Sequence, residues 1–316
     1  MKLTQHNAYF AVIVLVVLAL ILSACTASTP AATPGPAPTA GPSATGKIAL
    51  GLIENDPPTT IKTFQALADY LATHLGEFGI GVGVVKVAPD YETLAKWVKS
   101  GDVDLFFESP YLAMLLNEQI GAQPILRRWK GGIAEYNAVI FARVDSGLTS
   151  LSDLKGHMMA GESPESSSAY MLPVAYLITA GMNPVEKAQS DSAIAKDEIG
   201  YVFSGADDNT IQWVIGGKVA AGAINKPAYL EIPEETRAAL TILAETENMP
   251  RHLVLARPDM DPALLKAVKT LLIGMGDTAE TKAILQQAEK TAKFDEFPTE
   301  ATMARMRELY ELIKSK

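Results

Sequence analysis

The sequence is poor in cysteine, histidine and basic clusters, and each shortage excludes a class of protein. Its 316 residues include one cysteine and four histidines, and the formal net charge is −9. A single cysteine cannot form an internal disulfide, so the folded part must be held by its core alone. The densest basic segment, Arg127-Arg128-Trp129-Lys130, is too short to follow a phosphate backbone, so we expect no nucleic-acid partner.

Motifs of catalysis and metal binding are also missing or incomplete. His74, His157 and His252 lack the spacing of metal ligands, and neither a G-x-S-x-G elbow nor a phosphate-binding G-x-x-x-x-G-K-[ST] loop occurs. Ser152 and Lys155 fit the S-x-x-K pattern of penicillin-recognising enzymes, but its Ser-Asp-Asn and Lys-Thr-Gly partners are absent. We therefore expect binding without turnover, with no metal and no cofactor.

The first 24 residues have the three parts of a secretory signal. Lys2 provides the positive end, residues 8–22 form an almost unbroken apolar run, and small residues precede Cys25. The run from Leu22 to Cys25 resembles the bacterial lipoprotein signal, in which the cysteine takes a lipid before cleavage. We predict a signal peptide over 1–24, a lipid on Cys25 and an extracytoplasmic, membrane-anchored location. An uncleaved transmembrane helix is the alternative, since about 18 apolar residues can span a bilayer.

The composition changes twice more along the chain. Residues 26–46 are Thr, Ala, Pro, Gly and Ser, which cannot bury enough surface to fold, so we expect a disordered stalk over 25–46. From Lys47 onward, short apolar runs alternate with amphipathic segments, as in parallel β-α-β units. Strands are predicted at residues 47–53, 81–87, 103–107, 138–142, 157–160, 200–203, 221–224 and 252–256. Helices are predicted at residues 63–75, 91–99 and 210–215, and from residue 262 to the end. A short helix is also predicted to start at Ser150, and another is predicted to follow the serine-rich turn and to end near Ala180.

The number of strands favours two modest sheets over one very wide sheet. Two α/β lobes leave a cleft between them, and small ligands usually bind in such clefts. We expect lobe 1 at 47–138 plus 249–316 and lobe 2 at 139–248, with crossing strands near Ile140 and Val254.

A serine-rich turn at Gly161–Ser168 is the densest polar feature, and it lies between a predicted strand and a predicted helix. Ser166 can cap the helix, and the N–H groups of Ser167 and Ser168 point out of its first turn. Those donors, the hydroxyls and the helix dipole would make an anion site without any Lys or Arg. A helix cap alone is the alternative, but three serines exceed what capping needs.

The segment from Glu162 to Pro173 resembles the Ser-Thr-Ser-Gly-Tyr-x-x-Pro signature of phosphate/phosphite/phosphonate-binding proteins of ABC importers. Three further stretches are similar to the same family: Gly101–Tyr111, Tyr136–Gly156 and Ser204–Asp208. The resemblance implies an α/β, two-lobed periplasmic-binding-protein fold of type II that closes on a small oxyanion.

The resemblance also implies the residues that hold the ligand. The serines would hold the head group, Tyr111 would wall the cleft from the first lobe, and Asp208 would contact the ligand from the second. Asp207 stands where the family often has His. The expected ligand-binding residues are Ser166, Ser167, Ser168, Tyr111, Asp207, Asp208, Glu54 and Asn55.

Acidic side chains surround this supposed anion site, and an ionised phosphate would be repelled by any that faced it. They are Glu108, Glu162, Glu165, Asp207 and Asp208. We expect most of them to point to solvent, as surface carboxylates usually do. The alternative is that one or two face the ligand and accept hydrogen bonds from a P–OH or an ammonium group.

The implied partners are a phosphonate, phosphite or phosphate ligand, an ABC permease with its ATPase, and the membrane through the lipid on Cys25. The receptor is expected to act as a monomer. Two alternatives stay open: a lipid-anchored sensor that presents its ligand to a signalling receptor, and the same fold with a sulfonate or taurine-like ligand. We interpret residues 127–130 as a solvated patch rather than a docking point for the permease.

Overall fold

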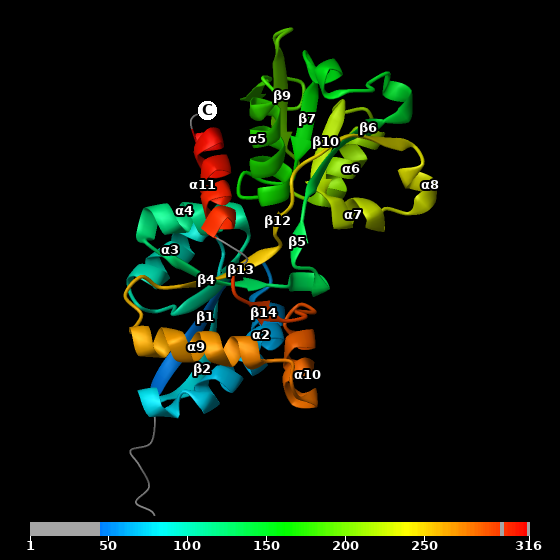
Figure 1. Ribbon diagram of the computed structural model, residues 1–316. Helices are drawn as coiled ribbons and strands as arrows, with labels where there is room; N and C mark the ends of the chain where they lie inside the picture. Colours follow the sequence, from blue (N-terminus) through cyan, green and yellow to red (C-terminus); the bar gives the residue numbers. More distant parts are fainter. Residues whose placement is uncertain (1–44, 298–299, 315–316) are drawn as a thin grey trace, which may run out of the picture. The chain divides into compact units, whose positions relative to one another are not determined.

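A computed structural model describes residues 45–297 and 300–314 (Figure 1). The predicted signal peptide, the lipid on Cys25 and the stalk up to residue 44 lie outside the described residues. The first strand, β1, begins at Gly46, one residue before the predicted strand. Among the described helices, none is both long enough and apolar enough to span a bilayer.

The first of two six-stranded sheets has the order β14-β4-β13-β3-β1-β2. β1 is parallel to β2 and β3, whereas β13 is antiparallel to both β3 and β4. Its strands are β1 (Gly46–Ile53), β2 (Ile80–Ala88), β3 (Leu105–Glu108), β4 (Gln123–Arg128), β13 (His252–Ala256) and β14 (Phe294–Asp295).

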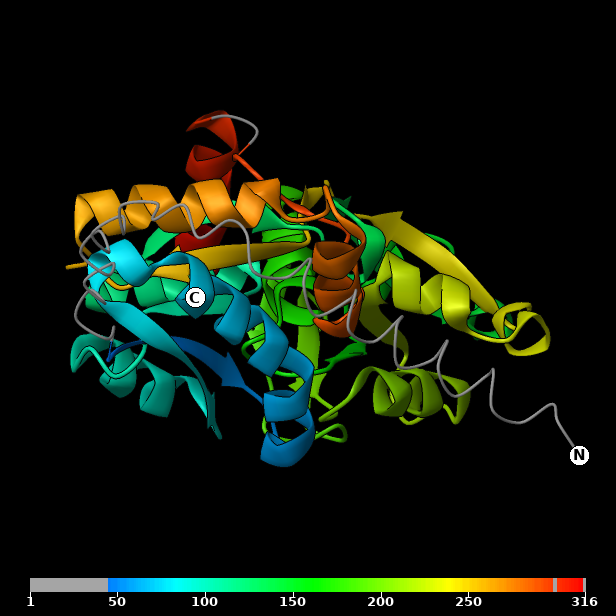
Figure 2. The ribbon, with the colours of Figure 1, turned by 90° about the horizontal axis from the view of Figure 1, so that it is seen from below.

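Helices cover both faces of this sheet because its strands are apolar on both sides. Phe106 faces the cluster that contains α3 and α4, whereas Leu105 and Phe107 face the cluster that contains α2, α9 and α10. Both α9 and α10 lie beside α2 (Figure 2). These helices are α2 (Pro57–His74), α3 (Tyr91–Lys99), α4 (Pro110–Ile120), α9 (Pro262–Gly274) and α10 (Ala279–Gln287).

The second six-stranded sheet has the order β11-β6-β10-β7-β9-β8. Its strands are β6 (Ala138–Arg143), β7 (Met158–Gly161), β8 (Asn183–Glu186), β9 (Glu198–Phe203), β10 (Ala221–Asn225) and β11 (Leu240–Glu245). One face packs on α5 (Leu172–Thr179), and the other on α6 (Asp207–Ile215) and α7 (Lys226–Glu231), while α8 (Glu234–Arg237) precedes β11. Two sheets, each packed with helices, confirm the predicted α/β class.

The chain passes between the two sheets through a short antiparallel ladder. In it, β5 (Glu135–Tyr136) pairs with β12 (Met249–Pro250). The predicted crossing positions, Ile140 and Val254, lie a few residues later, inside β6 and β13. Both crossing segments therefore lie about four residues earlier in the chain than predicted, and each joins its sheet almost at once.

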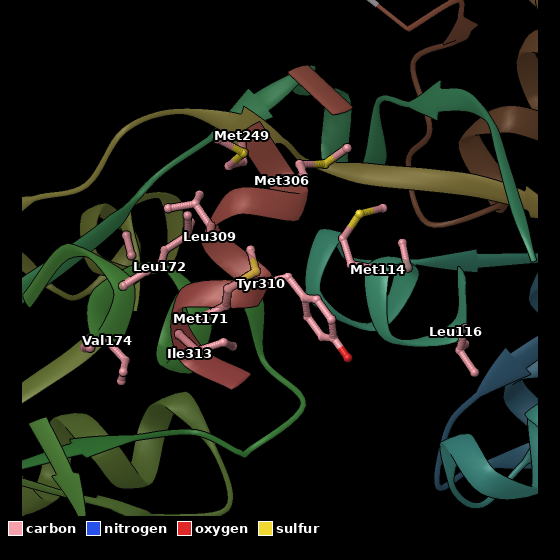
Figure 3. Close-up of a cluster of buried hydrophobic side chains, with 14 of the residues drawn as sticks. Met114, Leu116, Met171, Leu172, Val174, Met249, Met306, Leu309, Tyr310 and Ile313 are labelled. Atoms are coloured by element: carbon pink, nitrogen blue, oxygen red, sulfur yellow. The ribbon is translucent and has the colours of Figure 1, made fainter. Parts of the chain in front are cut away.

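The region after Pro262 is not helical throughout, contrary to the prediction. Glu289 and Lys290 adopt positive φ angles of 53° and 51° after α10, and β14 then pairs with β4. The last helix, α11 (Glu300–Lys314), contacts both α4 and α5 (Figure 3). One apolar cluster therefore runs from the first sheet through α4, α11 and α5 to the second sheet.

Candidate functional site

A cavity of about 330 Å³ lies where several strands end and the next helices begin. This is the usual position of a ligand in α/β proteins, because backbone donors and loop side chains gather at the carboxyl ends of parallel strands. The side that belongs to the first sheet contributes Glu108, Ser109, Leu112, Lys130 and His252. The side that belongs to the second sheet contributes residues 162–163, 165–168, 207 and 225, and the crossing segments contribute Tyr136 and Arg251.

The three predicted serines all line the cavity, at the start of a π-helical turn (Ser167–Met171) that continues into α5. The hydroxyl oxygen of Ser166 caps the turn by accepting the N–H of Ala169 at 3.1 Å. β7 approaches this turn closely, since a Cβ on Gly161 would lie 2.2 Å from the carbonyl oxygen of Ala169. The N–H groups of Ser167 and Ser168 belong to the first turn, which leaves such donors free for a ligand.

Two cationic side chains also line the cavity, so the expectation of a site without Lys or Arg was wrong. Lys130 Nζ lies 3.0 Å from a carboxylate oxygen of Glu289. The guanidinium carbon of Arg251 lies 4.6 Å from the ring centroid of Tyr136, over the face of the ring. Positive charge therefore comes from the first sheet and the crossing strands, and hydroxyl and N–H donors come from the second sheet.

The acidic side chains mostly line the cavity, contrary to the expectation that they point to solvent. Glu108, Glu162, Glu165 and Asp207 are part of its wall. Asp208 is exposed and lines a separate cavity of about 540 Å³ beside α6 and α7, which Asp207 also lines.

Burial changes the charge of this wall. Burial raises the pKa of Glu108 to about 8, and the positive charge of Lys130 lowers this pKa by a smaller amount. Burial, together with Glu162 and Asp208, raises the pKa of Asp207 to about 7. Glu108 is therefore mostly uncharged at neutral pH, and its carboxyl group can donate a hydrogen bond.

The remaining predicted ligand-binding residues do not line the cavity. The N–H of Tyr111 donates to the hydroxyl of Ser167 at 2.8 Å, and the Tyr111 ring packs edge-on against Tyr170. Glu54 and Asn55 are exposed residues that follow β1. Their contact with a ligand, like that of Asp208, stays a prediction.

Sequence reasoning missed Lys130, Tyr136, Asn225, Arg251 and His252, all of which line the cavity. Of these five, Tyr136 alone falls in a stretch that resembles the family, as its first residue, and all five are distant in sequence from the serine turn. Their positions at or just beyond the ends of β4, β5, β10, β12 and β13 become informative only once the strand order is known.

The basic segment 127–130 is not the solvated patch that we expected. Arg128 is 0% exposed and donates hydrogen bonds to Thr291, to the carbonyl oxygen of Ala288 and to Glu289. Arg127 pairs with Asp295 at 2.8 Å, and Lys130 lines the cavity. The segment thus fixes the loop after α10 and supplies one cation to the candidate site.

Solved structures of other proteins share this fold. The protein XAC2383 from Xanthomonas citri, in structures bound to chloride ion and to ATP, is 26% identical with a TM-score of 0.78, and the match covers 85% of this chain and 97% of that chain. PhnD1 from Prochlorococcus marinus, in complex with methylphosphonate, is 18% identical with a TM-score of 0.62 over 85% and 98% of the two chains. The periplasmic aliphatic sulphonate-binding protein SsuA from Escherichia coli is 15% identical with a TM-score of 0.54 over 85% and 87%.

These neighbours confirm the predicted type II periplasmic-binding-protein fold. The family model for the phosphonate periplasmic substrate-binding protein of ABC transporters matches residues 51–300, which include every described residue of the cavity wall and both sheets except the start of β1. The chain therefore belongs to the family of periplasmic, phosphonate-binding components of ABC transporters.

Proposed function

We propose that this protein is the lipid-anchored receptor of an ABC importer and that it holds a small phosphorus oxyanion in the cavity at Ser166–Ser168. The observation that carries the proposal is the convergence of these serines with Lys130 and Arg251 around one cavity. The receptor binds its ligand without turnover and passes it to the permease.

The cavity offers complementary groups to a phosphonate head. The oxygens of the head accept hydrogen bonds from the serine hydroxyls and from the N–H groups at the positive end of the π-turn and α5. Arg251 and Lys130 supply charge, which is worth more in a partly buried site than on the surface. These local donors are needed because the net charge of −9 gives no long-range attraction to an anion.

The acidic wall suits a ligand that also carries a donor. Among the described residues, the buried Oδ1 atom of Asp207 has no hydrogen-bond partner, whereas its Oδ2 accepts from Asn225 at 3.0 Å. Asp207 could accept a hydrogen bond from a P–OH or from the ammonium of an aminoalkylphosphonate. We therefore infer that aminoalkylphosphonates and protonated phosphonates bind in preference to the phosphate dianion.

Isothermal titration calorimetry with 2-aminoethylphosphonate, methylphosphonate, phosphite and phosphate tests this proposal. Arg251→Ala should weaken phosphonate binding at least tenfold, because a charge-assisted hydrogen bond is worth about 1.5–3 kcal/mol. Arg307→Ala is the matched control, since Arg307 is exposed on α11. Equal losses in both variants, or no binding of any phosphorus compound, would contradict the site.

The same titrations test the role of the acidic wall. Asp207→Asn should reduce the preference for 2-aminoethylphosphonate over methylphosphonate, because the amide replaces one acceptor oxygen by a donor. Tightest binding of plain phosphate at high pH would overturn this part of the proposal.

Attachment through Cys25 is tested separately from ligand binding. The full chain should partition with membranes and incorporate a labelled fatty acid, and Cys25→Ser should abolish the labelling. Labelling that persists in the variant would contradict the anchor.

Adjacent permease and ATPase genes would support import, whereas an adjacent histidine kinase gene would support the sensor alternative. The monomeric state is tested by light scattering of residues 45–316, and a measured mass equal to that of one chain would support it.

A further inference from the structure

Glu108 occupies an unusual position for an acidic residue in an anion site. It is the last residue of β3, is only 8% exposed, and lines the cavity together with the serine turn. Its backbone pairs with Leu253 of β13, so the rigid centre of the first sheet holds it. One carboxyl oxygen, Oε2, accepts the N–H of Ser109 at 3.3 Å.

No neighbouring cation neutralises this carboxyl group. Among the ion pairs of the described residues, none includes Glu108. Lys130 is paired with Glu289 at 3.0 Å, and Arg128 is paired with the same carboxylate at 2.9 Å. A buried carboxylate without an ionic partner is costly, and such groups usually take up a proton instead.

The charged and titratable groups around Glu108 come from both sides of the cavity. Lys130 follows β4 and favours ionisation, whereas Glu54 after β1 and Glu289 after α10 oppose it. Arg251, just before β13, and His252, its first residue, lie in the same wall, and burial lowers the pKa of His252 so that its ring is neutral. Tyr136 also lines the cavity, and Glu162, Glu165 and Asp207 line it from the side of the second sheet. Burial is the largest influence on Glu108 and raises its pKa to about 8.

We propose that Glu108 binds the ligand as a carboxylic acid, donating its O–H to an oxygen of the phosphonate, and that it sets the pH range over which the receptor holds its ligand. The inference rests on the proposed function, since it requires the phosphonate to occupy this cavity. When the O–H loses its proton, a donor is replaced by a negative charge beside the oxyanion, and the ligand is repelled.

Calorimetric titration of methylphosphonate from pH 6 to pH 9.5 tests the proposal with wild type, Glu108→Gln and Glu77→Gln. The ionisation of the ligand and of Asp207 is common to all three proteins. The ratio of wild-type affinity to Glu108→Gln affinity therefore isolates Glu108. With a pKa of about 8, this ratio should be steady below pH 7 and about tenfold lower by pH 9. Glu77 is exposed and outside the cavity wall, so the ratio of wild type to Glu77→Gln should stay constant.

A second variant and a spectroscopic measurement complete the test. Glu108→Met keeps the size of the side chain without a donor, and it should weaken binding at pH 6 at least tenfold. Infrared difference spectra at pH 6 should contain the C=O stretch of protonated carboxyl groups perturbed by the ligand. The band of Glu108 should be lost in Glu108→Gln, whereas any band of Asp207 should remain in that variant and be lost in Asp207→Asn.

The outcomes separate the two proposals. If wild type binds methylphosphonate but its ratio to Glu108→Gln is constant from pH 6 to pH 9.5, the role of Glu108 is overturned and the proposed function stands. If wild type binds no phosphorus compound at pH 6, both are overturned.

Discussion

Ser167 serves a structural partner as well as the proposed ligand. Its hydroxyl oxygen accepts the N–H of Tyr111, which lies in the first turn of α4 beside the first sheet. Ser167 itself comes after β7, a strand of the second sheet. Ser168 lies next to it and is also buried. Removal of the Ser167 hydroxyl therefore leaves the Tyr111 N–H without its acceptor, whereas removal of the Ser168 hydroxyl does not.

Alanine substitutions should distinguish the two serines. Ser167→Ala leaves the Tyr111 N–H without its acceptor, so it should lower both the free energy of unfolding and ligand affinity by about 1–3 kcal/mol. Ser168→Ala should lower affinity with a smaller loss of stability. Urea denaturation and calorimetry of both variants check this, and unchanged affinity in both would contradict the assignment of the serine turn.

The two buried carboxyl groups also make stability depend on pH. The folded-state pKa values of Glu108 and Asp207, about 8 and about 7, lie above their ordinary values of 4.5 and 3.8. Between these values the folded state binds more protons than the unfolded state, so the contribution of both groups to stability falls as pH rises. The slope is at most about 1.4 kcal/mol per pH unit for each group.

The double variant Glu108→Gln, Asp207→Asn should therefore lose less stability than wild type between pH 5 and pH 8. Thermal unfolding midpoints measured at half-unit steps test this, with Glu77→Gln as control. Parallel curves for wild type and the double variant would show that neither carboxyl group carries a raised pKa.

At the residue scale, the site residues that are neighbours in the chain could be predicted from the sequence. Those that the fold brings together from distant segments could not. The serine turn was predicted because its donors are neighbours in the chain and match a family signature. Lys130 and Arg251 were missed because they follow different strands and reach the cavity only through the strand order. Arg128 was misinterpreted, because nothing local in its sequence signals burial against Thr291 and Glu289.

At the scale of elements, α11 is the helix that joins the two halves of the apolar core. Met306, Leu309, Tyr310 and Ile313 are buried, and α11 contacts α4 on one side and α5 on the other (Figure 3). α5 is the continuation of the serine turn. Packing of α11 therefore supports the element that carries the proposed ligand donors.

Truncation of an α11 core residue should destabilise the protein strongly. Leu309→Ala should lower the free energy of unfolding by about 2–5 kcal/mol, because it removes buried methyl groups and leaves a cavity. Arg307→Ala, on the exposed side of α11, should change it by no more than about 0.5 kcal/mol. Guanidinium denaturation of both variants checks this, and equal stability would show that α11 is not part of the core.

Elements with a clear period or a continuous apolar run were predictable, and the others were not. β1 and β13 were found because both are short runs of buried apolar residues. α4 was missed because its buried residues are spread over most of its surface, which hides the helical period. β14 has only two residues and gives no sequence pattern, so the region after Pro262 was wrongly predicted as helical throughout.

At the scale of the whole molecule, the ligand should stabilise the fold because its proposed partners come from both sheets and from the crossing strands. A ligand that binds only the folded state adds about 2.7 kcal/mol at a concentration of 100 Kd. Differential scanning fluorimetry with methylphosphonate should therefore show a rise in the unfolding midpoint for wild type. A rise of the same size for Arg251→Ala at the same concentration would contradict the role of that cation.

The central claim is that one cavity, formed by the serine turn, Lys130 and Arg251, holds the phosphorus oxyanion. A crystal structure of residues 45–316 in complex with methylphosphonate tests it most directly. We predict the phosphorus atom inside this cavity, with its oxygens within hydrogen-bond distance of Ser167, Ser168 and Arg251. A ligand bound elsewhere, such as in the cavity beside α6 and α7, or an oxyanion without contact to the serine turn, would contradict the account.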